Sequence, residues 1–111
     1  MALRDMVSSK ELKIGNFIVE FATPGIGHIL KAAGCDFAFF DMEHSGFSFE
    51  TLKSAIRYFE AAGIAVIVRV PALENDMLAR ACDMGAEGLI APMISTAAQA
   101  QAMIDSVKYF P

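Results

Sequence analysis

The sequence has few cysteines, no long apolar run and no cluster of basic residues. Its two cysteines, Cys35 and Cys82, do not form the C-x-x-C motif of redox or zinc sites, and their apolar neighbours predict free, buried thiols. Apolar runs such as residues 37–40 and 65–68 are far shorter than the roughly 20 residues of a membrane-spanning helix. Residues 1–13 carry positive and negative side chains and lack the apolar segment of a secretory signal. These absences predict a cytoplasmic protein that does not enter a membrane.

Charged side chains are sparse, and acidic ones predominate. Nine Lys and Arg residues stand against thirteen Asp and Glu residues, which gives a formal net charge of -4 and disfavours a nucleic-acid partner. A chain of 111 residues with 55% hydrophobic side chains predicts one buried core and one domain at most. Because so short a chain buries a limited share of its surface, the mean hydropathy of +0.45 suggests that some apolar surface faces a partner or further chain.

Apolar strand-like segments alternate with helix-like segments along the chain. Three of the expected helices each stop at a glycine. These glycines are Gly34, Gly63 and Gly85. Strands are expected at residues 15–21, 36–40, 64–70 and 88–91. Helices are expected at residues 25–33, from 49 to Gly63, from 75 to Gly85 and from 97 onwards.

Helix caps and apolar stripes support these helices. Thr23 and Asn75 are candidate N-caps, and Thr96 with Gln99 forms a T-x-x-Q capping box. The helix that begins at Phe49 has its apolar residues at the spacing of one helical face. For the last helix the expected buried stripe is Ala97, Ala100, Ile104 and Val107.

The four strand–helix units define an α/β fold with two possible architectures. At the observed spacing, eight such units need about 200 residues, which is the lower end of the range for a (β/α)8 barrel. Four units therefore amount to half a barrel. A complete, open, doubly wound sheet of four strands is the alternative. Both architectures bury parallel strands, so the periodicity leaves the choice open.

The loop after the second strand concentrates titratable groups. Asp41, Glu43 and His44 lie within the string D-M-E-H-S, where ligands gather in parallel α/β folds. Histidine can take and return a proton near neutral pH, and an adjacent carboxylate can orient it. The alternative is a polar loop in which Ser45 or Ser48 caps the next helix.

Arg69 is the second candidate, because it ends an apolar strand that would otherwise exclude a charge. A guanidinium in a cleft can bind a carboxylate or a developing oxyanion. It can also pair with an acid on a neighbouring strand, such as Asp41 or Glu43, and the two interpretations are compatible. By contrast, His28 is expected to be solvated or half-buried, and residues 25–30 lack the third glycine of a dinucleotide-binding fingerprint.

Several strings together resemble the HpcH/HpaI aldolase family. They are A-G-C-D-F at 33–37, D-M-E-H-S at 41–45, V-R-V-P at 68–71, D-M-G-A-E-G at 83–88 and A-P-M at 91–93. Their order and spacing match from about residue 15 to residue 111. The family consists of metal-dependent class II pyruvate aldolases on a (β/α)8 TIM barrel, usually assembled as homohexamers. The resemblance therefore implies that residues 1–111 are a partial aldolase domain, the N-terminal half of such a barrel with the C-terminal half absent, and that the full-length form is a homo-oligomer.

The resemblance also assigns roles to residues. It implies that His44 is the catalytic base, that Arg69 binds the keto oxygen of pyruvate, and that Asp83 partners the histidine, while Asp41 and Glu43 complete the loop. The expected position of Asp83, at a helix end before a strand, lies on the amino side of the sheet and away from His44. On sequence grounds Asp41 is therefore the favoured orienting partner.

The implied reaction is cleavage of a 2-keto-4-hydroxy acid, the small keto-acid substrate, to pyruvate and an aldehyde. The implied cofactor is Mg²⁺, Mn²⁺ or Co²⁺, and its two carboxylate ligands follow later strands, beyond this chain. The chain alone is therefore expected to be inactive. The alternative function is a non-catalytic α/β binding or assembly module that associates through the exposed edge of its last strand.

Overall fold

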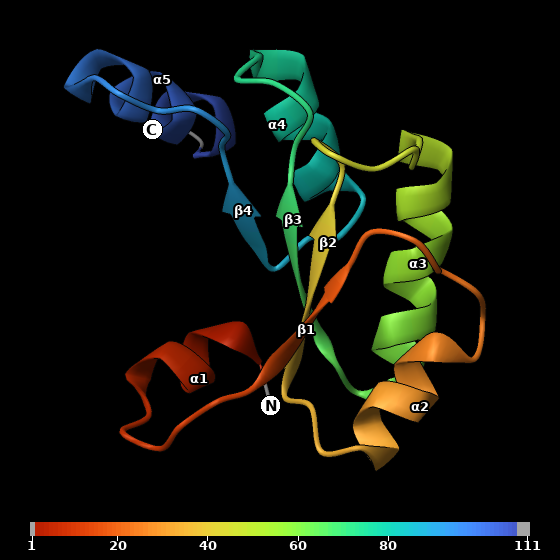
Figure 1. The fold of residues 1–111 in the computed structure, drawn as a ribbon. Helices are drawn as coiled ribbons and strands as arrows, with labels where there is room; N and C mark the ends of the chain where they lie inside the picture. Colours follow the sequence, from red (N-terminus) through yellow and green to blue (C-terminus); the bar gives the residue numbers. More distant parts are fainter. Residues whose placement is uncertain (1, 109–111) are drawn as a thin grey trace.

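The computed structural model describes residues 2–108, which form one parallel sheet and its helices (Figure 1). The strand order is β1-β2-β3-β4, and each neighbouring pair runs parallel. The elements are α1 (Leu3–Ser8), β1 (Gly15–Ile18), α2 (Ile26–Ala32), β2 (Phe37–Asp41), α3 (Phe49–Ala62), β3 (Ala65–Arg69), α4 (Asn75–Asp83), β4 (Gly88–Ile90) and α5 (Ala97–Val107). The alternation of strands and helices predicted from the sequence is confirmed.

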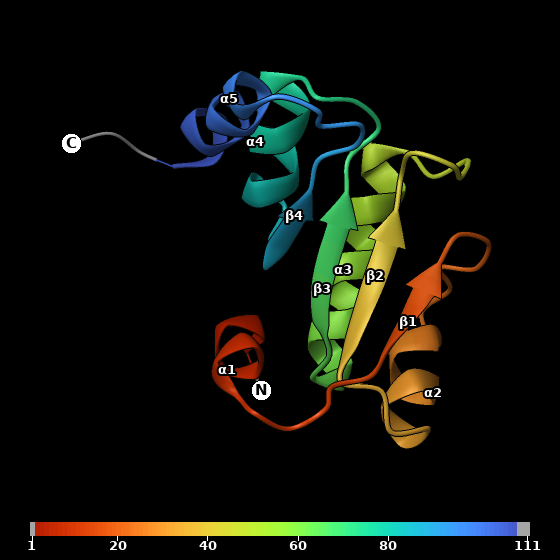
Figure 2. The ribbon, with the colours of Figure 1, turned by 60° about the vertical axis from the view of Figure 1, so that its left-hand side comes forward.

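The two faces of the sheet are covered unequally. In β2, Ala38 and Phe40 are fully buried against the helices, whereas Phe37 and Phe39 point to the other face and are only half-buried. Figure 2 shows α2 and α3 together on one side of the strands. The core on that side includes Phe40, Val68 and the stripe of α3, of which Leu52, Ile56 and Phe59 are at most 1% exposed.

Local signals explain where the helices end and begin. Gly34, Gly63 and Gly85 have φ values of 92°, 73° and 109°, a region that side-chain-bearing residues rarely adopt, so each glycine stops its helix as predicted. Ser48 caps α3 by accepting a hydrogen bond from the Thr51 N–H. The capping box of Thr96 and Gln99 at the start of α5 is also confirmed.

Several element boundaries differ from the sequence prediction. β1 ends at Ile18, and β2 extends to Asp41 because the ladder continues beside β3 up to Arg69. Thr23 is not a side-chain cap, since Gly25 holds the N-cap position of α2. Likewise Glu74, and not Asn75, holds the N-cap position of α4.

Other differences involve the two terminal helices. The stripe predicted for α5 is confirmed at Val107, which packs on the core, but is wrong at Ala97, which is exposed, and at Ile104, which is 44% exposed. Met103, which was not predicted, packs on the core together with Val107. Helix α1 was not predicted. It is held by a distant contact, in which the Leu3 N–H donates to the Glu87 carboxylate, and by burial of Met6.

Three further expectations can be compared with residues 2–108. Both cysteines are free, as predicted, although half-buried rather than fully buried. Within the described range, no helix is long and apolar enough to cross a membrane. His28 is exposed, which agrees with its predicted solvation.

Candidate active site

The parallel register places two charged side chains next to each other at the carboxyl end of the sheet. Asp41 at the end of β2 is the ladder partner of Arg69 at the end of β3. The Arg69 Nε–H donates to Asp41 Oδ1 over 2.8 Å. Arg69 therefore does pair with an acid of the neighbouring strand, one of the two compatible interpretations of its position.

The Asp41 carboxylate is fully buried and also organises the loop that follows it. Its Oδ1 accepts the Glu43 N–H over 2.9 Å, and its Oδ2 accepts the His44 N–H over 3.1 Å. Burial alone would raise the pKa of Asp41, but the hydrogen bonds from Arg69 and the two backbone N–H groups outweigh it and lower the pKa. Asp41 is thus held as a carboxylate.

Serine and phenylalanine side chains fix the rest of this loop. The Ser45 hydroxyl donates to the Asp41 carbonyl oxygen over 2.5 Å and accepts the Phe47 N–H over 3.2 Å. The Phe47 ring stacks on Phe40 in the core, with 4.6 Å between ring centroids. The loop that carries His44 is therefore anchored both to the end of β2 and to the core. Ser48, and not Ser45, is the helix cap.

The carboxylate beside the His44 ring is that of Glu43. His44 Nε2 lies 2.8 Å from Glu43 Oε1, and the same oxygen lies 3.7 Å from Arg69 Nε. The Glu43 side chain is 16% exposed and the His44 side chain 72%. Asp41, which we favoured as the orienting partner, contacts the backbone of His44 instead of its ring. The sequence signal for Glu43 is its adjacency to His44 within a strand-end loop.

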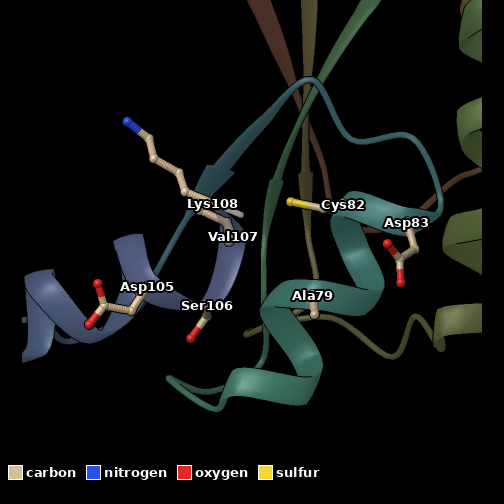
Figure 3. A pocket seen from close by; sticks show the side chains of 7 residues that line it. All are labelled: Ala79, Cys82, Asp83, Asp105, Ser106, Val107 and Lys108. Carbon is tan, nitrogen blue, oxygen red and sulfur yellow. The ribbon is translucent and has the colours of Figure 1, made fainter. Parts of the chain in front are cut away.

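Asp83 lies elsewhere in the molecule. It is the last residue of α4, which returns from the carboxyl end of β3 to the amino end of β4, so Asp83 lies at the opposite end of the sheet from Asp41. With Cys82 it lines a pocket of about 610 Å³ between α4 and α5, where Asp105 and Lys108 also lie (Figure 3). Burial, reinforced by the charge of Asp83, raises the pKa of the Cys82 thiol. Asp83 and His44 are therefore not brought together within the described part of this chain.

The residues at the site do not fit a divalent cation by themselves. Within residues 2–108, no three His, Cys, Asp or Glu side chains are grouped so that they could hold a metal ion. The buried Asp41 carboxylate already accepts three hydrogen bonds, and Glu43 lies against both His44 and Arg69. These carboxylates therefore serve to hold the site together.

The fold and the site define an α/β protein of parallel βα units, with a charged cluster at the carboxyl ends of neighbouring strands, where parallel α/β folds bind their ligands. Comparison with known proteins identifies the family. Residues 14–111 match the family model for HpcH/HpaI aldolase/citrate lyase. The chain belongs to this family.

Individual relatives support the family match. The chain is 31% identical over 106 residues to a 2-dehydro-3,6-dideoxy-6-sulfogluconate aldolase of Pseudomonas putida, covering 96% of this chain and 41% of the relative. It superimposes on an HpcH/HpaI aldolase from Desulfitobacterium hafniense DCB-2 with a TM-score of 0.92 and 28% identity, covering 100% of this chain and 43% of that one. For the citrate synthase SbnG the TM-score is 0.90 and the identity 31%, with 99% and 44% covered.

These matches establish the architecture. The chain spans about two-fifths of the length of the relatives it matches, 41% in the first case. Its four βα units are one part of the TIM barrel of HpcH/HpaI aldolases, which decides between the half-barrel and the complete open sheet. The relatives are aldolases and a citrate synthase, so the family is one of lyase-type enzymes that act on carbon–carbon bonds.

Proposed function

We propose that this chain is the N-terminal part of a class II pyruvate aldolase that cleaves 2-keto-4-hydroxy acids to pyruvate and an aldehyde. The observation that carries the proposal is the cluster of Asp41, Glu43, His44 and Arg69 at the carboxyl ends of β2 and β3. An imidazole and a guanidinium on neighbouring units can act on the hydroxyl and the keto oxygen that lie on either side of the bond that breaks. The family match supports this assignment.

Each side chain has a proposed role in the bond cleavage. The His44 imidazole removes the proton from the C4 hydroxyl of the substrate. The C3–C4 bond then breaks, C4 leaves as the aldehyde carbon, and the electron pair remains on the pyruvate part as an enolate. The enolate takes a proton at C3 and becomes pyruvate.

Arg69 supports this step from the other end of the substrate. Among the described residues, its hydrogen bond to Asp41 uses only Nε, so the two terminal nitrogens can donate to the keto oxygen. Because negative charge develops on that oxygen only as the bond breaks, a fixed guanidinium stabilises the transition state more than the bound substrate. Asp41 is a positioning residue in this scheme. Asp83 is proposed to reach His44 from a neighbouring subunit of the assembled protein, as a partner of the imidazole.

Within residues 2–108, no group of three or more His, Cys, Asp or Glu side chains could hold the divalent metal that the family implies. We propose that carboxylates outside the 111 residues supply its ligands, and that Mg²⁺, Mn²⁺ or Co²⁺ provides Lewis-acid assistance there. The 111-residue chain alone is then expected to release little or no pyruvate. We further propose a partial aldolase domain over residues 1–111, of which residues 1 and 109–111 lie outside the described part, a homo-oligomeric full-length form and a cytoplasmic location.

The test is a pyruvate-release assay on the protein expressed at the full length of its native reading frame. A panel of 2-keto-4-hydroxy acids is supplied with each of the three metals, and both products are quantified. We expect pyruvate and aldehyde in equal amounts. No release from any acid with any metal would overturn the proposed function. Robust metal-dependent release from the 111-residue chain alone would overturn the proposed origin of the metal ligands.

A further inference from the structure

Two phenylalanines on the open face of the sheet form a stacked pair next to the site. Phe17 of β1 is the ladder partner of Phe39 of β2, so their side chains project side by side. The ring centroids are 4.9 Å apart with an interplanar angle of 28°. Phe17 is 50% exposed, so this pair is not part of the core between the sheet and the helices.

The Arg69 guanidinium lies over both rings. Its central carbon is 5.4 Å from the centroid of Phe39 and 5.8 Å from that of Phe17, within the distance of a cation–π interaction. The register explains this placement, because Phe39 pairs with Ile67, and Arg69 follows two residues later on the same face of β3. One guanidinium thus lies over an aromatic pair and donates a hydrogen bond from Nε to Asp41.

The two kinds of contact restrain different motions. A single hydrogen bond from Nε to Asp41 fixes one atom of the guanidinium, but the plane can still turn about that bond. Two rings within cation–π distance of the guanidinium restrict this turning, because the attraction to the ring quadrupole depends on how the cation faces the ring. The direction of the two terminal nitrogens is then set by both Asp41 and the aromatic pair.

We propose that Phe39, together with Phe17, is a positioning residue that orients the Arg69 guanidinium towards the keto acid. This inference rests on the proposed function of Arg69 and adds the means by which its donors are aimed. Phe39 acts through Arg69 and does not touch the reacting atoms.

The matched variants are Phe39→Leu and Phe37→Leu. Both residues lie on β2 and project to the same face, but the Phe37 ring packs over Gly15, and only Phe39 contacts Arg69. A third variant, Phe39→Tyr, keeps the aromatic ring. Loss of packing alone would affect the two leucine variants alike, whereas loss of orientation would affect Phe39→Leu only and be rescued in Phe39→Tyr.

The first measurement needs no enzymatic activity. In the 111-residue chain, the Arg69 Nε–H resonance is assigned by its loss in Arg69→Lys, and its proton shift reports the ring current of the nearby phenylalanines. We expect Phe39→Leu to move this resonance, while Phe37→Leu and Phe39→Tyr leave it near its wild-type position. An unchanged resonance in Phe39→Leu would overturn the proposal.

The second measurement uses the protein at its native full length, so that a leucine variant unable to fold as the short chain is still tested. We expect Phe39→Leu to lower kcat/KM about 3- to 30-fold, with Phe39→Tyr close to wild type. An equal loss in Phe37→Leu, or no rescue by tyrosine, would contradict the positioning role. Failure of the wild type to release pyruvate refutes the aldolase function, and the resonance then decides the orientation of Arg69 independently.

Discussion

Replacing Asp41 with alanine is expected to lower the free energy of unfolding by about 3–5 kcal/mol, because it removes a fully buried carboxylate that accepts three hydrogen bonds. The carboxylate is fully buried and accepts hydrogen bonds from Arg69 and from the backbone N–H groups of Glu43 and His44. In the alanine variant these three donors lose their acceptor. The loop that carries His44 loses its anchor at the end of β2.

Urea denaturation at pH 7 measures this loss. The matched control is Asp76→Ala, which removes an exposed carboxylate in the first turn of α4 and is expected to cost at most about 1 kcal/mol. A loss below about 1 kcal/mol for Asp41→Ala would show that the buried carboxylate and its hydrogen bonds do not stabilise the fold.

The pH dependence of stability is an independent test of the interactions of Asp41. The folded protein keeps the pKa of Asp41 below the ordinary value of 3.8, so the carboxylate stabilises the fold fully above that value. The stabilisation is lost as the pH falls below 3.8 and through the lowered folded-state pKa. The difference in stability between the wild type and Asp41→Asn is therefore expected to be large at pH 7 and to shrink in acid. A difference that grows in acid would contradict the lowered pKa.

Replacing Arg69 with lysine is expected to lower kcat/KM of the full-length protein about 10²- to 10³-fold, comparable to the loss of one oxyanion donor in other enzymes. Lysine keeps the positive charge near Asp41 but lacks the fork of donors that the guanidinium presents. It also lacks the planar group that lies over Phe17 and Phe39.

The pyruvate-release assay measures this effect, and Arg80→Lys provides the control. Arg80 is an exposed arginine of α4 that also lies over an aromatic ring, that of Phe49 at 4.4 Å, but it is separate from the cluster around Asp41. Its replacement is expected to leave kcat/KM nearly unchanged. Equal activity in Arg69→Lys and the wild type would remove Arg69 from the catalytic scheme.

Much of the fold follows from short-range signals in the sequence. The strand–helix alternation, the positive φ of Gly63 and Gly85 and the capping box at Thr96 all depend on residues within one or two turns of each other. Features set by distant contacts could not be predicted this way. Helix α1 depends on the bond from Leu3 to Glu87, far along the chain. The inward face of α5 depends on how it packs against α4.

The candidate site shows the same division. The sequence indicated which residues lie at the strand ends, so Asp41, His44 and Arg69 were predicted to be near one another. It could not choose the acid that pairs with Arg69, because that depends on the register between β2 and β3. The Phe17–Phe39 pair depends equally on the register between β1 and β2. The contact of Glu43 with the His44 ring depends on side-chain rotamers, which no pattern in the sequence specifies.

The central claim is that His44 and Arg69 serve one binding site for a small keto acid. A crystal structure of the full-length protein with pyruvate tests it most directly. We expect pyruvate within hydrogen-bond distance of the terminal nitrogens of Arg69, with the His44 imidazole on the same side of the ligand. Pyruvate bound between α4 and α5, or an imidazole and a guanidinium that face separate cavities, would contradict it.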